Sequence, residues 1–149
     1  MELILIRHLK TPGNEKRQYI GSTDEELSEQ EVLNFKQRYK IDSYPQVQQV
    51  IVSPMKRCIQ TAELIYPKNQ ITQEVLLKEC DFGIFEDKTL EQLRAIPEFH
   101  QWISSGMREA PPQGESAQDV ALRSTYGLQR LFKKMMEEQL HSVALISHA

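Results

Sequence analysis

Two short apolar runs of this chain end at a histidine. Residues 1–6 lead into Arg7 and His8, and residues 142–147 lead into His148. Short runs rich in leucine and β-branched residues, bounded by polar groups, predict strands buried on both faces, as in parallel sheets. Ligands of open parallel α/β sheets bind beyond the carboxyl ends of the strands. The pattern therefore predicts that both histidines lie where such a site forms.

Between these runs, strand-like and helix-like segments alternate. Residues 11–24 are typical of a long surface loop, residues 47–52 predict a second strand, and residues 74–78 predict a weaker one. Apolar positions at helical spacing predict helices that begin at Ser28, at Ser53-Pro54 and at Ser116, and two short helices over residues 89–96 and 98–105 divided by Pro97.

The starts of the three longer helices carry capping signals. Ser28 with Glu31 predicts a capping box, and Ser53 before Pro54 predicts a cap followed by proline at the first helical position. Ser116 can cap the last helix, whose predicted apolar positions include residues 120, 126, 128, 131, 132 and 135. Strands that alternate with helices predict a three-layer α/β/α sandwich with a mostly parallel central sheet.

Composition narrows the class of protein. The 149 residues support one domain with a real core, and 40% hydrophobic and 26% charged residues are ordinary for a soluble globular protein. A net charge of −3 gives no electrostatic reason to expect nucleic acid or a membrane surface as partner. An anionic substrate must then be met by local positive charge.

Neither cysteine usage nor the amino-terminal run points to export. Cys58 and Cys80 have no metal-ligand spacing and form no disulfide framework, so we expect a reducing, cytoplasmic compartment. The opening apolar run lacks a basic leader and is interrupted by Arg7 and His8, so it predicts neither a secretion signal nor a membrane span.

Arg57 falls in the first turn of a predicted helix, where the helix dipole disfavours a cation. An anion bound at that terminus would compensate it, because backbone donors and a guanidinium fork both favour phosphate-like oxygens. The alternative is that Arg57 lies along the surface with its charged head in water. Arg7, which also follows a predicted strand, favours the anion site.

His8 alone could be a buried imidazole bonded to a carbonyl group. Beside Arg7, and matched by His148, it is a candidate nucleophile or proton carrier. A neutral imidazole can attack phosphorus without a separate base when nearby cations screen the phosphoryl charge. A metal site is disfavoured, because no histidine pair has ligand spacing and arginines would repel a cation.

An ordered set of sequence motifs spans the chain. The segments are Arg7-His8-Leu9-Lys10-Thr11-Pro12-Gly13-Asn14, residues 19–28, Ser53-Pro54-Met55-Lys56-Arg57-Cys58-Ile59-Gln60-Thr61-Ala62, residues 77–86, Gly114-Glu115-Ser116 and Ile146-Ser147-His148. Each motif alone would be weak, but as an ordered set they resemble the histidine phosphatase superfamily, which includes phosphoglycerate mutases and many small phosphatases.

The resemblance implies a phosphoglycerate mutase-like fold in which His8 becomes a transient phosphohistidine. It also implies that Arg7, Arg57 and His148 hold the phosphoryl oxygens, and that Glu79 donates a proton to the leaving oxygen. Without it, Glu79 would be an exposed loop carboxylate, and Asp81 is the rival acid. The implied substrate-binding residues are Thr11, Asn14, Gly21, Ser22 and Thr23, for three of which (Thr11, Asn14, Ser22) plain turn-forming roles are the alternative.

Several positions depart from the pattern of the superfamily. Leu9 and Lys10 replace its usual glycine and glutamate, which affects substrate preference. Ala149 follows His148 directly, whereas the superfamily continues with a glycine, a helix and usually a strand. We therefore expect residues 1–149 to be a single domain that lacks the carboxyl-terminal helix and strand, with apolar sheet surface left uncovered and a homodimer as one consequence.

Within the superfamily, the chain most resembles alpha-ribazole phosphatases of cobalamin synthesis, through its size, Lys10 and residues 81–93. The expected activity is a metal- and cofactor-independent phosphomonoesterase acting on a small phosphorylated metabolite. The alternatives are a phosphoglycerate mutase-type phosphotransferase and a phosphate-ester-binding module with little turnover.

Overall fold

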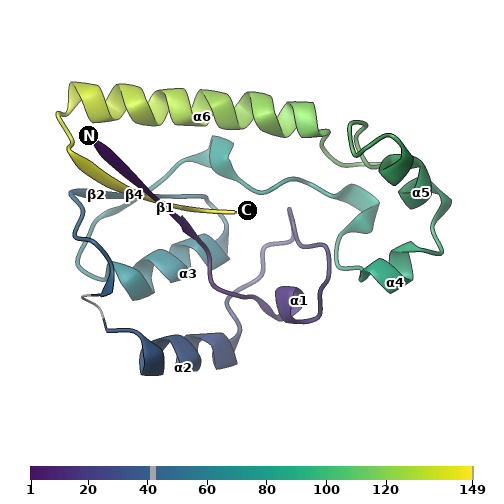
Figure 1. Cartoon of the computed structure of the whole chain (residues 1–149), viewed down its shortest axis with the longest axis horizontal. Helices are drawn as coiled ribbons and strands as arrows, with labels where there is room; N and C mark the ends of the chain where they lie inside the picture. The colour runs from purple at the N-terminus through teal and green to yellow at the C-terminus, as the bar shows by residue number, and fades with distance from the viewer. Residues whose placement is uncertain (41–42, 149) are drawn as a thin grey trace.

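The computed structural model describes residues 1–40 and 43–148 and has helices on both faces of a parallel sheet (Figure 1). Its four strands lie in the order β1-β4-β2-β3 and all pair in parallel. The strands are β1 (Glu2–Arg7), β2 (Gln49–Val52), β3 (Ile71–Gln73) and β4 (Ser142–Ser147). The helices are α1 (Pro12–Glu15), α2 (Glu29–Arg38), α3 (Lys56–Ile65), α4 (Leu90–Leu93), α5 (Pro97–Ser104) and α6 (Ala117–Glu137), with short 3₁₀ turns η2 (Val75–Leu77) and η3 (Gly83–Phe85).

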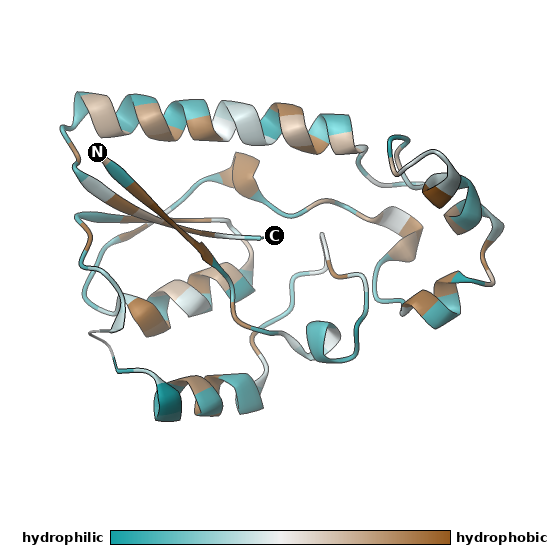
Figure 2. Ribbon diagram, viewed as in Figure 1, coloured by the Kyte–Doolittle hydropathy of each residue, from teal (hydrophilic) through white to brown (hydrophobic). Residues whose placement is uncertain are grey.

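Alternate faces of the strands bury against different helices, which confirms the three-layer sandwich. Val50, Val52 and Ile146 pack with residues of α3 and with Phe35 of α2. On the other face Ile51 and Leu145 pack with Leu77 and with Leu131 and Met135 of α6. In Figure 2 much of the strand ribbon is accordingly brown, the colour of apolar residues, whereas the helices alternate between brown and teal.

The last strand lies between the first and the second, so β4 is buried on both faces as predicted. The same prediction is wrong for β1. Leu5 is 71% exposed, and β1 is the edge of the sheet among the described residues, paired with β4 alone.

Three local predictions need correction. The second strand is shorter than residues 47–52, and the third occupies Ile71–Gln73 rather than residues 74–78. It pairs there with β2, while the Glu74 side chain accepts from Leu76 N and starts the turn η2. The long loop also contains α1, which Thr11 caps.

The start of α3 differs as well. Ser53 does not cap it, because the helix begins at Lys56 and the Ser53 hydroxyl contacts His148 instead. Asp24 replaces the predicted cap: its Oδ1 accepts from Lys56 N at 2.7 Å. A carboxylate there satisfies a free amide of the first turn and suits the helix dipole.

The remaining helices start close to their predicted positions. Ser28 accepts from Glu31 N, but its own N–H bonds Lys10 O, so the Glu31 side chain does not complete a capping box. Ser116 and Asp119 form a complete box at α6. Tyr126 and Phe132, two of the predicted apolar positions of α6, are 55% and 38% exposed.

A second, smaller core lies beyond the sheet, around α4 and α5 (Figure 1). Phe85, Leu93, Phe99 and Trp102 are buried there against one another. Phe99 and Trp102 are therefore packing residues of this core. This cluster supports the segment from Asp81 to Glu115 that faces the carboxyl ends of the strands.

Candidate active site

His8 and His148 lie side by side at the carboxyl edge of the sheet. Their strands are neighbours in parallel register, with Arg7 opposite Ser147, and His8 N donates to Ser147 O at 3.0 Å. The two imidazole rings meet edge to face with centroids 5.3 Å apart. Residues from the two ends of the chain are thus brought into contact by strand pairing alone.

The hydrogen bond of His8 defines its tautomer. Nδ1 lies 2.6 Å from Leu9 O, and a carbonyl oxygen only accepts, so Nδ1 carries the hydrogen and Nε2 keeps its lone pair. Burial, and then the charges of Arg57 and Arg7, lowers the pKa of His8 to about 4. At neutral pH the ring is therefore an uncharged nucleophile with a free nitrogen.

His148 is held by residues of the β2–α3 segment. Its Nε2 lies 2.7 Å from the Ser53 hydroxyl, and the Cys58 sulfur is 3.7 Å from the same nitrogen. Burial, and then the charge of Arg57, lowers the pKa of His148 to about 3. The contact with Ser53 was not anticipated from the sequence, where serine before proline is typical of a helix cap.

Arg57 is fully buried, so the alternative of a surface arginine is wrong. Its Nη1 donates to Thr23 O at 2.9 Å and its Nη2 to Gly21 O at 2.8 Å. Its Nε has no hydrogen-bond partner within residues 1–40 and 43–148. A buried donor left unpaired costs about 1–3 kcal/mol, so the protein satisfies this positive charge only in part, and the charge favours an anion nearby.

Glu79 follows the turn η2, and its side chain extends toward His148. Its Oε2 is 3.7 Å from His148 Nδ1, its Oε1 accepts from Cys80 N at 2.8 Å, and its side chain is 21% exposed. The alternative of an exposed loop carboxylate is therefore wrong. Burial raises the pKa of Glu79 even though Arg57, Arg123 and Arg7 oppose the shift, so the carboxyl stays protonated to a higher pH than an exposed glutamate.

Arg7 is the last residue of β1 and lies close enough to lower the pKa values of both histidines. With Glu79 and His148 it lines a groove of about 520 Å³ between β1, β4 and α6, whose other walls are mostly apolar. The structure thus gathers Arg7, His8, Arg57, Glu79 and His148, the five residues singled out for chemistry.

The loop Gly21–Thr23 lies between Arg57 and a carboxylate that the sequence reading missed. Glu86 accepts from the backbone N–H groups of Gly21, Ser22 and Thr23 and from the Thr23 hydroxyl, while the carbonyl groups of Gly21 and Thr23 face Arg57. Burial alone would raise the pKa of Glu86, but these hydrogen bonds hold it below its usual value. The only signal in the sequence was its place at the end of the motif over residues 77–86.

Thr11 and Asn14 form a local cap. The Thr11 hydroxyl accepts from Asn14 N and the Asn14 Oδ1 accepts from Thr11 N, each at 3.2 Å, which builds the first turn of α1. Asp81, the rival acid, accepts from the Ser22 hydroxyl and from Gly83 N. These contacts are the turn-forming arrangements expected of such residues, and any contact of Thr11 or Asn14 with a ligand stays a prediction.

Leu9 has a packing role. Its side chain lies against the core between the sheet and α3, and its N–H donates to the Thr61 hydroxyl at 3.0 Å. Thr61 in turn donates to Arg57 O at 2.7 Å. The backbone beside the nucleophile candidate is therefore tied to the helix that carries Arg57.

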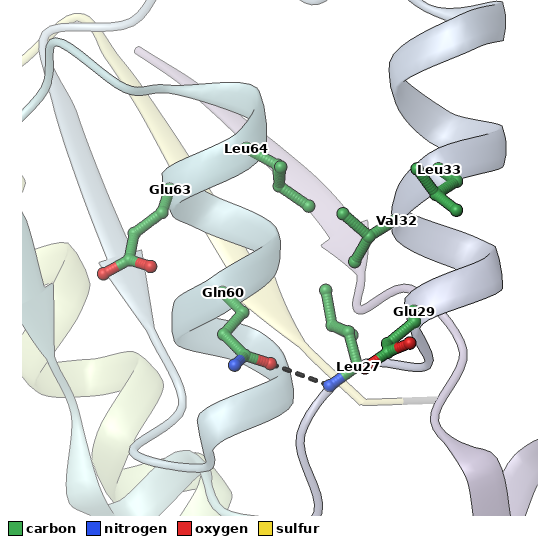
Figure 3. Close-up of a pocket in the computed structure, with 7 residues that line it drawn as sticks. All are labelled: Leu27, Glu29, Val32, Leu33, Gln60, Glu63 and Leu64. Carbon is green, nitrogen blue, oxygen red and sulfur yellow. Dashed lines mark hydrogen bonds between the residues drawn. The ribbon is translucent and has the colours of Figure 1, made fainter.

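A separate apolar groove lies between α2 and α3 (Figure 3). Leu27, Val32 and Leu64 line it, and Leu27 N donates to Gln60 Oε1 at 2.7 Å across its floor. None of the five clustered polar residues lines this groove. It is not part of the candidate site.

Two kinds of feature are absent from the part of the chain that the structure describes. Within residues 1–40 and 43–148, no three His, Cys, Asp or Glu side chains gather in a way that would hold a metal ion. In the same part of the chain, no helix combines the length and apolar character needed to cross a membrane.

Comparison with known proteins assigns the family. The family model described as histidine phosphatase superfamily (branch 1) matches residues 3–149. The chain belongs to the histidine phosphatase superfamily. The resemblance drawn from the ordered motifs is thereby confirmed, and so is the phosphoglycerate mutase-like fold.

The sequence identity to individual members of this superfamily is low. The chain is 34% identical over 105 residues to fructose-2,6-bisphosphatase TIGAR B of Danio rerio, covering 66% of this chain and 39% of that protein. It is 28% identical over 152 residues to phosphoserine phosphatase 1 of Hydrogenobacter thermophilus, covering 99% and 71%. Among solved structures, the alpha-ribazole phosphatase from Shigella flexneri superposes with a TM-score of 0.85 at 22% identity, covering 99% of this chain and 74% of that one. That likeness shows the fold alone.

Proposed function

We propose that this chain is a phosphomonoester hydrolase that acts through a phosphohistidine at His8. The observation that carries the proposal is the pairing of a neutral, correctly oriented His8 with a fully buried Arg57 whose Nε has no partner among the described residues. An imidazole with a free Nε2 beside a buried guanidinium that the protein satisfies only in part is suited to attack a bound phosphoryl group.

In the first step, the lone pair of His8 Nε2 forms a bond to phosphorus while the bond from phosphorus to the ester oxygen breaks. Glu79, whose pKa is raised by burial, gives its proton to the leaving oxygen, so an alcohol departs. Arg7, Arg57 and His148 hold the phosphoryl oxygens and screen the charge. The products of this step are phosphohistidine and alcohol.

In the second step, water attacks phosphorus and gives a proton to the Glu79 carboxylate. The bond between His8 and phosphorus breaks, phosphate leaves, and Glu79 is protonated again. The pKa values of His8 and His148 are low without a ligand, first because of burial and then because of the arginines. A bound dianion would offset the arginine charge, so His148 can take up a proton and hydrogen-bond the phosphate.

The substrate we propose is a small phosphorylated metabolite, with alpha-ribazole phosphate as the first compound to test. Residues 81–93 support this choice through their sequence resemblance to alpha-ribazole phosphatases. Because the leaving group contacts loops rather than strands, the identity of the metabolite depends on residues outside the cluster of five.

Rapid mixing with a ³²P-labelled phosphomonoester in the presence of a chelator tests the proposal. We expect a protein-bound label that is labile to acid and stable to base, release of phosphate, and loss of both in His8→Ala. His141→Ala is the matched control, because His141 is exposed and remote from the cluster. Binding without label or phosphate release would instead indicate a binding module, and transfer of the label to a second metabolite would indicate a mutase.

A further inference from the structure

Arg123 of α6 makes a set of contacts that the reaction above does not use. Its Nε donates to Glu115 Oε1 at 2.8 Å, and its Nη2 donates to Glu115 Oε2 at 2.8 Å. The other contacts go to backbone carbonyl groups. Nη1 reaches Leu76 O at 2.9 Å and Lys78 O at 2.6 Å, and Nη2 reaches Glu79 O at 2.9 Å.

These carbonyl groups belong to the segment that carries the proposed acid. Leu76 and Lys78 precede Glu79, so the guanidinium binds the backbone up to and including the acid itself. Without such a partner, carbonyl groups in an irregular, partly buried segment would lack hydrogen bonds. The direction of the Glu79 backbone, and hence of its side chain, therefore depends on Arg123.

Glu115 holds the other side of the same segment. Its Oε2 accepts from Asp81 N at 3.0 Å, and its own N–H donates to Asp81 O at 2.8 Å. The hydrogen bonds from Arg123 are the main reason that the pKa of Glu115 lies below its usual value. In the ion pair of Arg123 and Glu115, the arginine thus binds the backbone up to Glu79, and the glutamate binds it at Asp81.

Only an arginine fits this position. The planar guanidinium offers donors in a fixed fork that can serve a bidentate carboxylate and several carbonyl groups at once, whereas a lysine ammonium is a single point. The Arg123 side chain is 13% exposed, so water cannot easily replace the lost bonds. By contrast the Arg130 side chain, further along α6, is 66% exposed, and its Nε lies 3.4 Å from the Glu74 carboxylate.

We propose that Arg123 is a positioning residue for Glu79: through the backbone carbonyl groups of residues 76, 78 and 79, it sets where the proton-donating carboxyl stands relative to His148 and the leaving oxygen. The inference rests on the proposed function, because it assigns Arg123 to proton donation and not to phosphate binding. A change of Arg123 should therefore slow the cleavage of esters whose leaving oxygen needs a proton, and spare esters whose leaving oxygen is already a stable anion.

The test measures kcat/KM for a series of phosphate esters from 4-nitrophenyl phosphate through phenyl phosphate to an alkyl phosphate. The quantity kcat/KM includes steps only up to loss of the leaving group, so a slow second step does not hide the effect. For Arg123→Lys we expect a loss of roughly tenfold or more on the alkyl ester, within the range of general acid catalysis, and a rate near that of the unchanged protein on the nitrophenyl ester. Arg130→Lys should follow the unchanged protein on every ester.

Equal losses on all esters would overturn the positioning role, since they would indicate a general loss of structure. If Arg123→Lys does not fold, as judged by circular dichroism, Glu115→Gln decides the matter. It keeps the shape of the side chain but weakens the pair with Arg123, and it should steepen the dependence on the leaving group in the same direction. A flat dependence in that variant would also overturn the inference.

The two proposals fail in different ways. If the unchanged protein forms no labelled His8 and releases no phosphate from any ester, the proposed function is wrong. If it turns over the esters and the variants lose the same factor on each, only the role of Arg123 is wrong.

Discussion

Glu79 and Glu86 lie in the same connecting segment, yet their surroundings shift the pKa values of the two carboxyl groups in opposite directions. Glu79 accepts one backbone hydrogen bond, from Cys80 N, and its pKa is raised by burial. Glu86 accepts from a ring of backbone and hydroxyl donors, and its pKa is lowered although burial opposes this. Carboxyl groups whose environments push their pKa values apart are suited to different tasks.

The difference teaches which carboxylate can carry a proton. A poorly solvated carboxyl with one donor gains little from being charged, so it can release and recover a proton during a reaction. A carboxylate surrounded by donors is a fixed anion that organises the backbone. Sequence resemblance pointed to Glu79 as the acid, and the contrast with Glu86 adds a physical reason that does not depend on the resemblance.

The largest expected effect that tests the contrast between Glu79 and Glu86 is on the catalytic rate. Glu79→Gln removes the proton donor, and we expect kcat for an alkyl phosphate to fall by about 10²- to 10⁴-fold. Steady-state phosphate release measures it. Asp81→Asn is the matched control, because Asp81 is the rival acid of the same loop; a larger loss in that variant than in Glu79→Gln would reverse the assignment.

The next effect is on stability and ligand affinity. Glu86→Ala leaves the backbone N–H groups of Gly21 and Thr23 and the Thr23 hydroxyl without their charged acceptor, so we expect a loss of about 2–5 kcal/mol in the free energy of unfolding. Inhibition by phosphate should weaken as well, because the same loop holds Arg57. Urea unfolding and phosphate inhibition measure the two changes. An unchanged unfolding midpoint would show that Glu86 does not organise the loop.

A smaller change removes one donor of that ring, the Thr23 hydroxyl, which also lies 3.3 Å from Asp87 Oδ2. The Thr23 hydroxyl donates to Glu86 Oε2 at 2.7 Å, and Thr23→Val keeps the shape but removes this donor. We expect a loss of about 1–2 kcal/mol in the free energy of unfolding. Thr23→Ser, which keeps the hydroxyl, is the control and should lose less; the opposite order would mean that packing of the methyl group matters more than the bond.

The smallest effect is on the pH dependence of the free energy of unfolding, to which Glu79 and Glu86 contribute slopes of opposite sign. Because the folded pKa of Glu79 lies above its ordinary 4.5, the folded state binds more protons, so this group lowers the free energy of unfolding as the pH rises above about 4.5. Because the folded pKa of Glu86 lies below 4.5, its stabilisation is present above about pH 4.5 and is lost as the pH falls through the folded pKa.

Urea unfolding at a series of pH values measures both slopes. The advantage of Glu79→Gln over the unchanged protein should grow with rising pH, and the deficit of Glu86→Gln should shrink with falling pH. Glu91→Gln controls for the loss of one negative charge at an exposed position. Parallel curves for Glu79→Gln and Glu86→Gln would contradict the contrast.

Part of this architecture follows from the sequence by itself. The apolar runs before His8 and His148 predict strands, and parallel strands in one sheet bring their carboxyl ends to the same edge because hydrogen bonding aligns them. The caps at Ser28 and Ser116 locate α2 and α6, since a side-chain oxygen that satisfies a first-turn amide is a local signal. The sequence also predicts membership of the superfamily, because the motifs occur in a specific order along the chain.

Other features were decided only by tertiary structure. The edge position of β1 depends on which strands pair, and the exposure of Leu5 depends on what packs against that face of the sheet. Asp24 replaced Ser53 as the cap of α3 because folding brings this side chain, distant in sequence, to 2.7 Å from Lys56 N. The bonds of Arg123 to the Glu79 backbone and of Glu86 to the Gly21–Thr23 loop join residues with no local pattern, so no periodicity or propensity signals them; they form only once folding brings the segments within hydrogen-bond distance.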